Sequence, residues 1–157
     1  MNIELITIGK TDSKEIAAII DDYTRRINFH TKFSITILPD VRRGKAFTEQ
    51  TQRSAEAELL LKQIQSGDYV VLLDEKGEQM RSLEFASWLQ KRMNSGVKRL
   101  CFIIGGPYGF AEEVYKRGDM KLSLSKMTFS HQIVRAIFAE QLYRAHTILS
   151  GEPYHHE

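Results

Sequence analysis

Short apolar runs rich in isoleucine and valine alternate along this chain with longer segments whose apolar residues recur at helical spacing. This alternation is typical of α/β domains, in which a mostly parallel sheet carries helices on both faces. The third run, YVVLL, is apolar without alternation, which indicates a strand buried on both faces. The strands are expected at residues 3–8, 33–38, 69–73, 100–104 and 121–124, and the helices at 13–29, 48–64, 83–93, 111–117 and 131–149.

Length and composition favour a single soluble domain over residues 1–157. No apolar run approaches the roughly 20 residues that cross a bilayer, so no membrane partner is expected. The N-terminus has no basic segment leading into a long apolar stretch, and the one cysteine, Cys101, cannot form an internal disulfide. We therefore expect a cytoplasmic protein in which Cys101 is a small core residue.

Capping and turn residues give the expected boundaries of several elements. Asp12 and Glu15 have the spacing of a capping box at the start of the first helix, and Ser130 is placed to cap the last one. Residues 74–77, DEKG, are expected to turn the chain after the third strand.

A glycine-rich loop, GGPYG at residues 105–109, follows the fourth strand, where open α/β sheets hold their sites. It matches neither GxGxxG nor GxxxxGK[ST], and Pro107 removes a backbone donor that a phosphate cradle would use. The loop therefore suits an uncharged ring or a ribose better than a pyrophosphate. A plain strand-to-helix turn is the alternative interpretation.

The last helix carries apolar residues around most of its circumference. Only the sector of Arg135, Ala139 and His146 is expected to face solvent. Glu140 and Arg144 lie one turn apart inside the apolar sector, where unpaired charges are costly, so they should bond each other or a partner. A helix that is apolar around most of its circumference must be buried on most sides, and a small domain cannot bury all of it. This favours burial in a subunit interface. Its apolar residues are Ile133, Ala136, Ile137, Leu142, Tyr143, Ala145, Ile148 and Leu149.

Other chemistries have little support in the sequence. Neither His131 nor the pair His155 and His156 has the spacing of a zinc motif, so no metal is expected, and no GxSxG or cysteine–histidine signature indicates a nucleophile. The net charge of +2 neither demands nor excludes a nucleic acid. The basic cluster of Arg42, Arg43 and Lys45 is a candidate phosphate contact or a solvated loop.

Three segments, FIIGGPYGF, LSLSKMTFSHQIVRAIFAEQLYRAHTI and GEPYHHE, resemble the SPOUT class of RNA methyltransferases, and within it the ribosomal RNA large subunit methyltransferase H family. The resemblance covers the whole chain, and the C-terminal third is its most specific part. One departure is Ser130, where many relatives carry a proline, and it alters only the cap of the last helix.

The resemblance implies a homodimer with a C-terminal trefoil knot that methylates N3 of a pseudouridine in 23S rRNA on the assembled ribosome. The implied methyl donor is S-adenosylmethionine, which has no phosphate and therefore needs apolar walls and backbone groups. Carried onto this sequence, the cofactor residues are Leu73, Gly105, Leu124, Ser125, Lys126, Met127, Thr128 and Phe129.

The resemblance also assigns hypothetical roles to the C-terminal residues. Tyr154 would stack on or orient the target base, and His155 would accept its proton or contact the RNA. Glu140 and Arg144 would fix the site at the dimer interface, while Lys126 would join the basic cluster in neutralising phosphates. A frayed tail and a structural ion pair are the alternatives.

Three alternative functions follow from the same residues. The first is methylation of another RNA base, and the second is a ribosome-associated RNA-binding module that has the fold without the chemistry. The third, a dinucleotide-binding oxidoreductase, is the weakest because the chain lacks the glycine fingerprint of that class.

Overall fold

The computed structural model describes residues 1–41 and 47–157, so Arg42, Arg43 and Lys45 lie outside the described residues. In the described part, five strands form one parallel sheet in the order β2-β1-β4-β3-β5. The predicted α/β class with a parallel sheet is thereby confirmed. The strands are β1 (Asn2–Ile8), β2 (Phe33–Leu38), β3 (Tyr69–Gln79), β4 (Arg99–Ile104) and β5 (Met120–Ser123).

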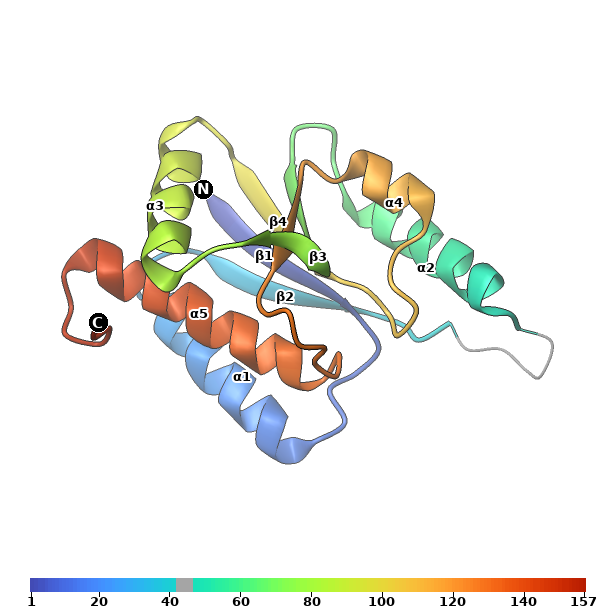
Figure 1. Ribbon diagram of the computed structural model, residues 1–157, viewed down its shortest axis with the longest axis horizontal. Coiled ribbons are helices and arrows are strands. Elements are labelled where there is room, and N and C mark those ends of the chain that lie inside the picture. The colour runs from blue at the N-terminus through green and yellow to red at the C-terminus, as the bar shows by residue number, and fades with distance from the viewer. Residues whose placement is uncertain (42–46) are drawn as a thin grey trace.

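Helices cover both faces of this sheet, as predicted. On one face α5 lies between α1 and α3, and α2 and α4 cover the other (Figure 1). Along β4, Leu100 and Phe102 pack toward the three-helix face, whereas Cys101 and Ile103 pack toward the other. The helices are α1 (Lys14–Ile27), α2 (Glu49–Gln63), α3 (Ser82–Asn94), α4 (Glu112–Arg117) and α5 (Ile133–Ser150).

The predicted turn at residues 74–77 was wrong, because β3 continues through this segment to Gln79. β5 pairs with β3 twice, since Leu122 lies opposite both Leu73 and Glu78 across a register shift. Gly77 permits the close approach, because a Cβ there would lie 2.6 Å from the backbone carbonyl carbon of Lys121. The turn residues therefore make a bulge that keeps the strand pairing on both sides.

The capping box predicted at Asp12 and Glu15 was also wrong by one residue. Ser13 caps α1, and its hydroxyl accepts a hydrogen bond from the Ile16 amide at 3.3 Å. The Asp12 amide instead donates to Gln132 Oε1 at 2.8 Å, so Asp12 belongs to the loop before the helix. Ser130 does accept from the Ile133 amide at 3.2 Å, at the start of α5.

The orientation predicted for α5 needs correction, because the sector expected to face solvent is buried. Arg135 is only 2% exposed, and Ala139 and His146 are buried as well, whereas Ile133 is exposed. Arg135 tolerates burial because its guanidinium donates to the carbonyls of Ile8, Gly9 and His131 and to the Thr11 hydroxyl. Backbone carbonyls therefore satisfy a cation that hydropathy alone assigns to the surface.

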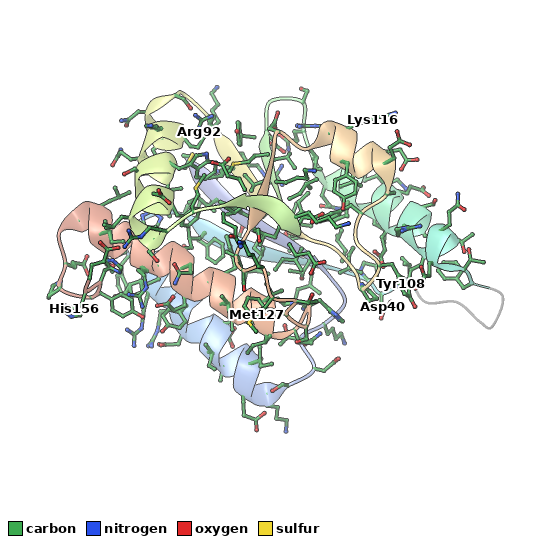
Figure 2. All side chains as sticks on the ribbon, in the orientation of Figure 1. Asp40, Arg92, Tyr108, Lys116, Met127 and His156 are labelled. Carbon is green, nitrogen blue, oxygen red and sulfur yellow. The ribbon has the colours of Figure 1, made fainter. Side chains whose placement is uncertain are left out.

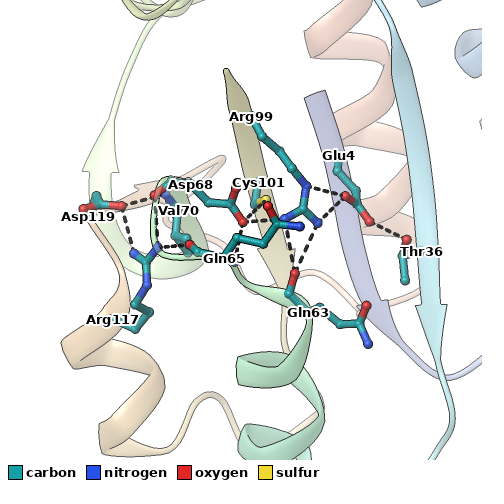
Figure 3. Close-up of polar contacts among 10 residues, drawn as sticks. All are labelled: Glu4, Thr36, Gln63, Gln65, Asp68, Val70, Arg99, Cys101, Arg117 and Asp119. Atoms are coloured by element: carbon teal, nitrogen blue, oxygen red, sulfur yellow. Dashed lines mark hydrogen bonds and ion pairs between the residues drawn. The ribbon is translucent and has the colours of Figure 1, made fainter. Parts of the chain in front are cut away.

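A polar network joins the amino ends of the strands (Figure 3). Arg99 at the start of β4 donates to Glu4 at 2.5 Å and also pairs with Asp68. Cys101 is fully buried beside this network, and burial raises the pKa of its thiol to about 12. Its prediction as a small core residue is confirmed. The network occupies the amino ends of the strands, so the opposite, carboxyl ends are left to form a site.

Candidate active site

A cavity of about 410 Å³ opens beside the bulge in the middle of β3 and at the carboxyl ends of β4 and β5. These three strands are neighbours in the sheet, so the segments there converge on one place. The floor and walls include Leu73 from β3, Ile104 and Gly105 from the end of β4, and Leu122 and Leu124 from the end of β5 and the residue after it. The segment leading into α5 and its first turn close the cavity with Met127, Thr128, Phe129, Ser130, His131 and Val134.

The predicted cofactor residues meet at this cavity, with one exception. Lys126 is exposed and does not line it. The others do line it, although they come from three separate parts of the chain: Leu73, Gly105, Leu124, Ser125, Met127, Thr128 and Phe129.

Internal hydrogen bonds hold the loop between β5 and α5. The Ser123 hydroxyl donates to the Ser125 carbonyl at 2.8 Å, and the Ser125 hydroxyl accepts from the Met127 amide at 2.9 Å. Thr128 donates to Glu75 Oε2 at 2.6 Å, which ties the loop to the extension of β3. The polar residues of this loop are therefore used to set its shape.

The glycine loop at residues 105–109 also depends on close contacts. A Cβ at Gly105 would lie 2.9 Å from the ring of Phe110. Gly109 has a φ of +74°, a conformation that glycine adopts without strain, and its amide donates to the Gly106 carbonyl at 3.3 Å. The loop thus presents bare backbone to the cavity.

Two carboxylates that the sequence reading assigned to a turn, Asp74 and Glu75, line the same cavity. Tyr115 Oη donates to Asp74 Oδ2 at 2.5 Å, and burial together with this hydrogen bond raises the pKa of Tyr115 to about 12. None of the described lining residues is a lysine or an arginine. The electrostatics therefore suit a neutral or cationic ligand and disfavour a phosphate.

The predicted catalytic residues form a second group, at the C-terminal end of α5. Arg144 donates to Glu140 Oε1 through Nη2 at 2.5 Å and through Nε at 3.1 Å, so the two charges pair as predicted. Tyr154 Oη donates to the same carboxylate oxygen at 3.1 Å, and His155 Nδ1 lies 3.2 Å from Arg144 Nη1. The tail is therefore bound to the helix rather than frayed.

Tyr154 is held from several sides. Its ring packs against Tyr143 with the centroids 4.8 Å apart, and the Arg144 guanidinium carbon lies 4.8 Å from its centroid. Its hydroxyl also lies 3.1 Å from the Tyr23 hydroxyl on α1. Burial and the hydrogen bond with Tyr23 raise the pKa of Tyr154 well above its usual value, so this tyrosine is a hydrogen-bond donor rather than a base.

The cavity and the C-terminal cluster lie at different ends of α5. Figure 2 labels Met127 beside the entry to the helix and His156 at its far end. None of Glu140, Arg144, Tyr154 and His155 lines the described cavity. Within one chain the tail is therefore not returned to the cavity.

Comparison with known proteins identifies the family to which this chain belongs. Residues 1–155 match the family described as "Predicted SPOUT methyltransferase". The chain belongs to the SPOUT methyltransferase family. This membership confirms the resemblance found in the sequence, while the trefoil knot stays a prediction.

Curated relatives resemble this SPOUT methyltransferase over its full length. It is 58% identical, over 99% of both chains, to "Ribosomal RNA large subunit methyltransferase H" of Christiangramia forsetii. Proteins of the same name from Flavobacterium johnsoniae and Parabacteroides distasonis are 54% and 52% identical over all of both chains.

In the described part of this SPOUT methyltransferase, none of the helices is long and apolar enough to span a membrane. No cluster of three or more histidine, cysteine, aspartate or glutamate side chains has the arrangement of a metal site there.

Proposed function

We propose that this chain transfers a methyl group from S-adenosylmethionine to N3 of a pseudouridine in 23S rRNA on the assembled ribosome. The observation that carries the proposal is the cavity beside the middle of β3 and the ends of β4 and β5, which combines apolar walls, bare glycine backbone and carboxylates. The names of the relatives, which refer to ribosomal RNA of the large subunit, support the substrate class. The cytoplasm, where ribosomes are found, would be the compartment.

The residues of the cavity fit this methyl donor. A volume of about 410 Å³ suits a small organic molecule, and side chains such as Leu73, Leu124 and Phe129 offer surfaces for an adenine ring. Asp74 and Glu75 favour the positive charge of a sulfonium and an amino group. When bound, the donor supplies an electrophilic methyl group on its sulfonium.

The main task of the chain is then to align two reactants. Holding reacting groups in line contributes about 7–11 kcal/mol, whereas a general base typically adds about 10²–10⁴-fold in rate. The loops that line the cavity are fixed by internal hydrogen bonds, which supports a positioning role. We therefore expect changes in these loops to reduce the rate more than loss of any one proton acceptor.

The separation of the cavity from the tail supports the proposed homodimer. Tyr154 and His155 do not line the cavity of their own chain. If both groups act on one nucleotide, a second copy must bring its tail to the cavity. Glu140 and Arg144 would then hold that tail in shape, because they bind Tyr154 and His155 directly.

The contact between Arg144 and His155 favours one of the two roles left open for this histidine. A guanidinium only donates hydrogen bonds, so Nδ1 of His155 must be the acceptor, and a neutral ring then carries its proton on Nε2. Protonation of Nδ1 would place two donors against each other. Nε2 is itself buried and lies 3.8 Å from Glu157 Oε1. His155 is therefore proposed to contact the RNA rather than to accept the proton of the base.

Basic groups would neutralise phosphates around the cavity. Lys126 is exposed beside the residues that line it, and we assign this role to Lys126 and to Arg42, Arg43 and Lys45. Their loss should lower affinity without changing the methylated base.

The test of this function is transfer of a labelled methyl group from S-adenosylmethionine to ribosomes that lack the modification, compared with free rRNA. We expect label in 23S rRNA of intact particles, and mapping should locate it on N3 of a pseudouridine. Label on another nucleotide would indicate a different RNA target. Failure to bind S-adenosylmethionine in calorimetry would instead support a non-catalytic RNA-binding module.

A further inference from the structure

Glu56 on α2 is a buried carboxyl group that the sequence patterns did not single out. It is only 3% exposed, and Oε1 accepts a hydrogen bond from Gln52 Nε2 at 3.0 Å. Within residues 1–41 and 47–157, no lysine or arginine forms an ion pair with it. A buried carboxyl without a cation is unfavourable, so its location needs an explanation.

The neighbour that explains it is the glycine loop. The Glu56 carboxyl lies directly against Gly106, and its proximity to the Gly106 amide opposes the rise in its pKa. A Cβ at Gly106 would lie 2.6 Å from Oε2 and closer still to Oε1, so the carboxyl rests directly on the loop backbone. Glu56 therefore contacts the same loop whose other side lines the methyl-donor cavity.

The loop is a wall between two cavities. A small cavity of about 50 Å³ is lined by Gln52 and Glu56, and it shares Gly106, Pro107 and His131 with the larger cavity. Glu56 thus acts from the α2 side of this wall, and the methyl donor would bind on the other side.

Glu56 and the larger cavity share this short stretch of backbone. Gly105 lines the larger cavity, and Gly106, against which the Glu56 carboxyl lies, lines both cavities. A change at Glu56 therefore moves backbone that the donor would contact.

We propose that Glu56 is a positioning residue for the methyl donor: its contact with Gly106 holds the backbone of the glycine loop in the position that the donor contacts. This inference rests on the proposed function. The other titratable groups that line the small cavity with Glu56 are Lys10, Asp12, Asp40 and His131. Burial raises the pKa of Glu56, with lesser opposing effects from Gln52 and Gly106.

The first experiment measures the affinity of the full chain for S-adenosylmethionine by calorimetry. Glu56→Ala should weaken binding about tenfold or more, and Glu56→Gln, which preserves the shape, should weaken it less. Glu58→Gln is the matched control, because Glu58 is exposed on the same helix and pairs with Lys62 at 2.9 Å. We expect the control to bind the donor normally.

A pH series separates positioning from general stability. In the unaltered chain, donor affinity should fall as the pH is lowered toward the raised pKa of Glu56, because a protonated carboxyl is a weaker acceptor. Glu56→Gln has no proton to gain there, so its affinity should be flat over the same range. Its unfolding temperature at neutral pH should not fall, because the buried charge is gone.

A double substitution tests the contact itself. Gly106→Ala should clash with the carboxyl and weaken donor binding strongly, because the added Cβ meets Oε1 and Oε2. In a Glu56→Ala background the same change should have little further effect, because the clashing group is absent. Additive losses would count against the proposed contact.

The outcomes distinguish this inference from the proposed function. If the unaltered chain binds S-adenosylmethionine and both Glu56 variants bind it equally well at every pH, Glu56 is not a positioning residue. If the unaltered chain does not bind the donor at all, the proposed function fails and takes this inference with it.

Discussion

The two ends of α5 are built by different means. At its start, the cavity is made of strand-end loops that present backbone and apolar groups, and the polar side chains of those loops bond within the loops. At its other end, Glu140, Arg144, Tyr154 and His155 bond to one another through their side chains. The first end has a cavity for a ligand. At the other end the charged side chains are already paired with one another.

This difference implies different sensitivities to change. A cavity lined by backbone is most sensitive to added volume. A cluster of paired side chains is most sensitive to the loss of one member, because its partner is then left unpaired.

Added volume at the cavity end should have the largest effect on donor affinity. Gly105→Val places side-chain atoms against the Phe110 ring, 2.9 Å from the position of the new Cβ, and the loop must move. Overpacking of this kind costs about 1–3 kcal/mol, and we expect donor affinity to fall about tenfold or more. Calorimetry with S-adenosylmethionine measures it. Gly67→Ala is the control, because no atom lies within 4 Å of a Cβ there, and normal binding by Gly105→Val would contradict the role of the loop.

Acid should weaken the C-terminal half of α5 through His146. Burial lowers the pKa of this histidine from 6.5 to about 4 in the folded chain. Below pH 6.5 the unfolded chain binds a proton here and the folded chain does not, so stability falls as the pH falls toward about 4. The expected loss is about 3 kcal/mol, measured by urea unfolding across this pH range.

His146→Leu tests the source of that loss. It should flatten the pH dependence, because the replacement has no proton to bind. His156→Gln changes an exposed histidine of the tail and should leave the dependence unchanged. Equal acid sensitivity in His146→Leu and the unaltered chain would show that another group is responsible.

Breaking the ion pair between Arg144 and Glu140 should affect methyl transfer without affecting donor affinity. Arg144→Met leaves the half-buried carboxylate of Glu140 without its cation and should lower stability by about 2 kcal/mol. We expect methyl transfer to ribosomes to be lost while donor affinity is retained, because Arg144 does not line the cavity. Loss of donor affinity in this variant would mean that the ends are coupled.

The matched control for that change is Lys62→Met. Lys62 pairs with Glu58 at the same spacing along α2, but both side chains are exposed, at 66% and 70%. An exposed pair of this kind contributes only about 0.3–0.5 kcal/mol. Equal effects of the two substitutions on stability would argue that burial of the pair on α5 has no consequence.

The smallest expected effect is that of the Tyr154 hydroxyl. Tyr154→Phe removes its hydrogen bonds with Tyr23 and Glu140 and retains the ring packing against Tyr143. The free energy of unfolding should fall by about 1 kcal/mol. Tyr69→Phe, whose ring packs against Trp88, is the control. A change in methyl transfer much larger than the change in stability would assign the hydroxyl a role on the substrate.

The sequence predicted the strands and helices well because their apolar periodicity is strong. It failed at residues 74–77, since turn-forming residues there make a bulge in a continuing strand, which depends on β5 far along the chain. It also misplaced Arg135, because the carbonyls that satisfy this cation belong to the loop after β1 and to His131.

Some residues of the candidate site were likewise predicted from the sequence, and others were missed. Leu73, Gly105 and residues 124–129 were found through resemblance, since periodicity alone gives no reason to group them. Asp74, Glu75 and Glu56 were missed. Carboxylates in the segment DEKG are typical of a turn, and a carboxylate on a polar helix is typical of the surface. Only the fold shows that Asp74 and Glu75 line the cavity and that Glu56 lies against its loop. That Glu140 and Arg144 bond each other could be predicted, because both lie on one helix.

Cys101 offers a way to time the opening of this fold. It is the single cysteine of the chain, it lies fully buried in the middle of β4, and its thiol has a pKa of about 12. A thiol reagent can therefore reach it only when the central sheet separates. The rate of labelling at this one atom would serve as a clock for global opening, read without any added probe.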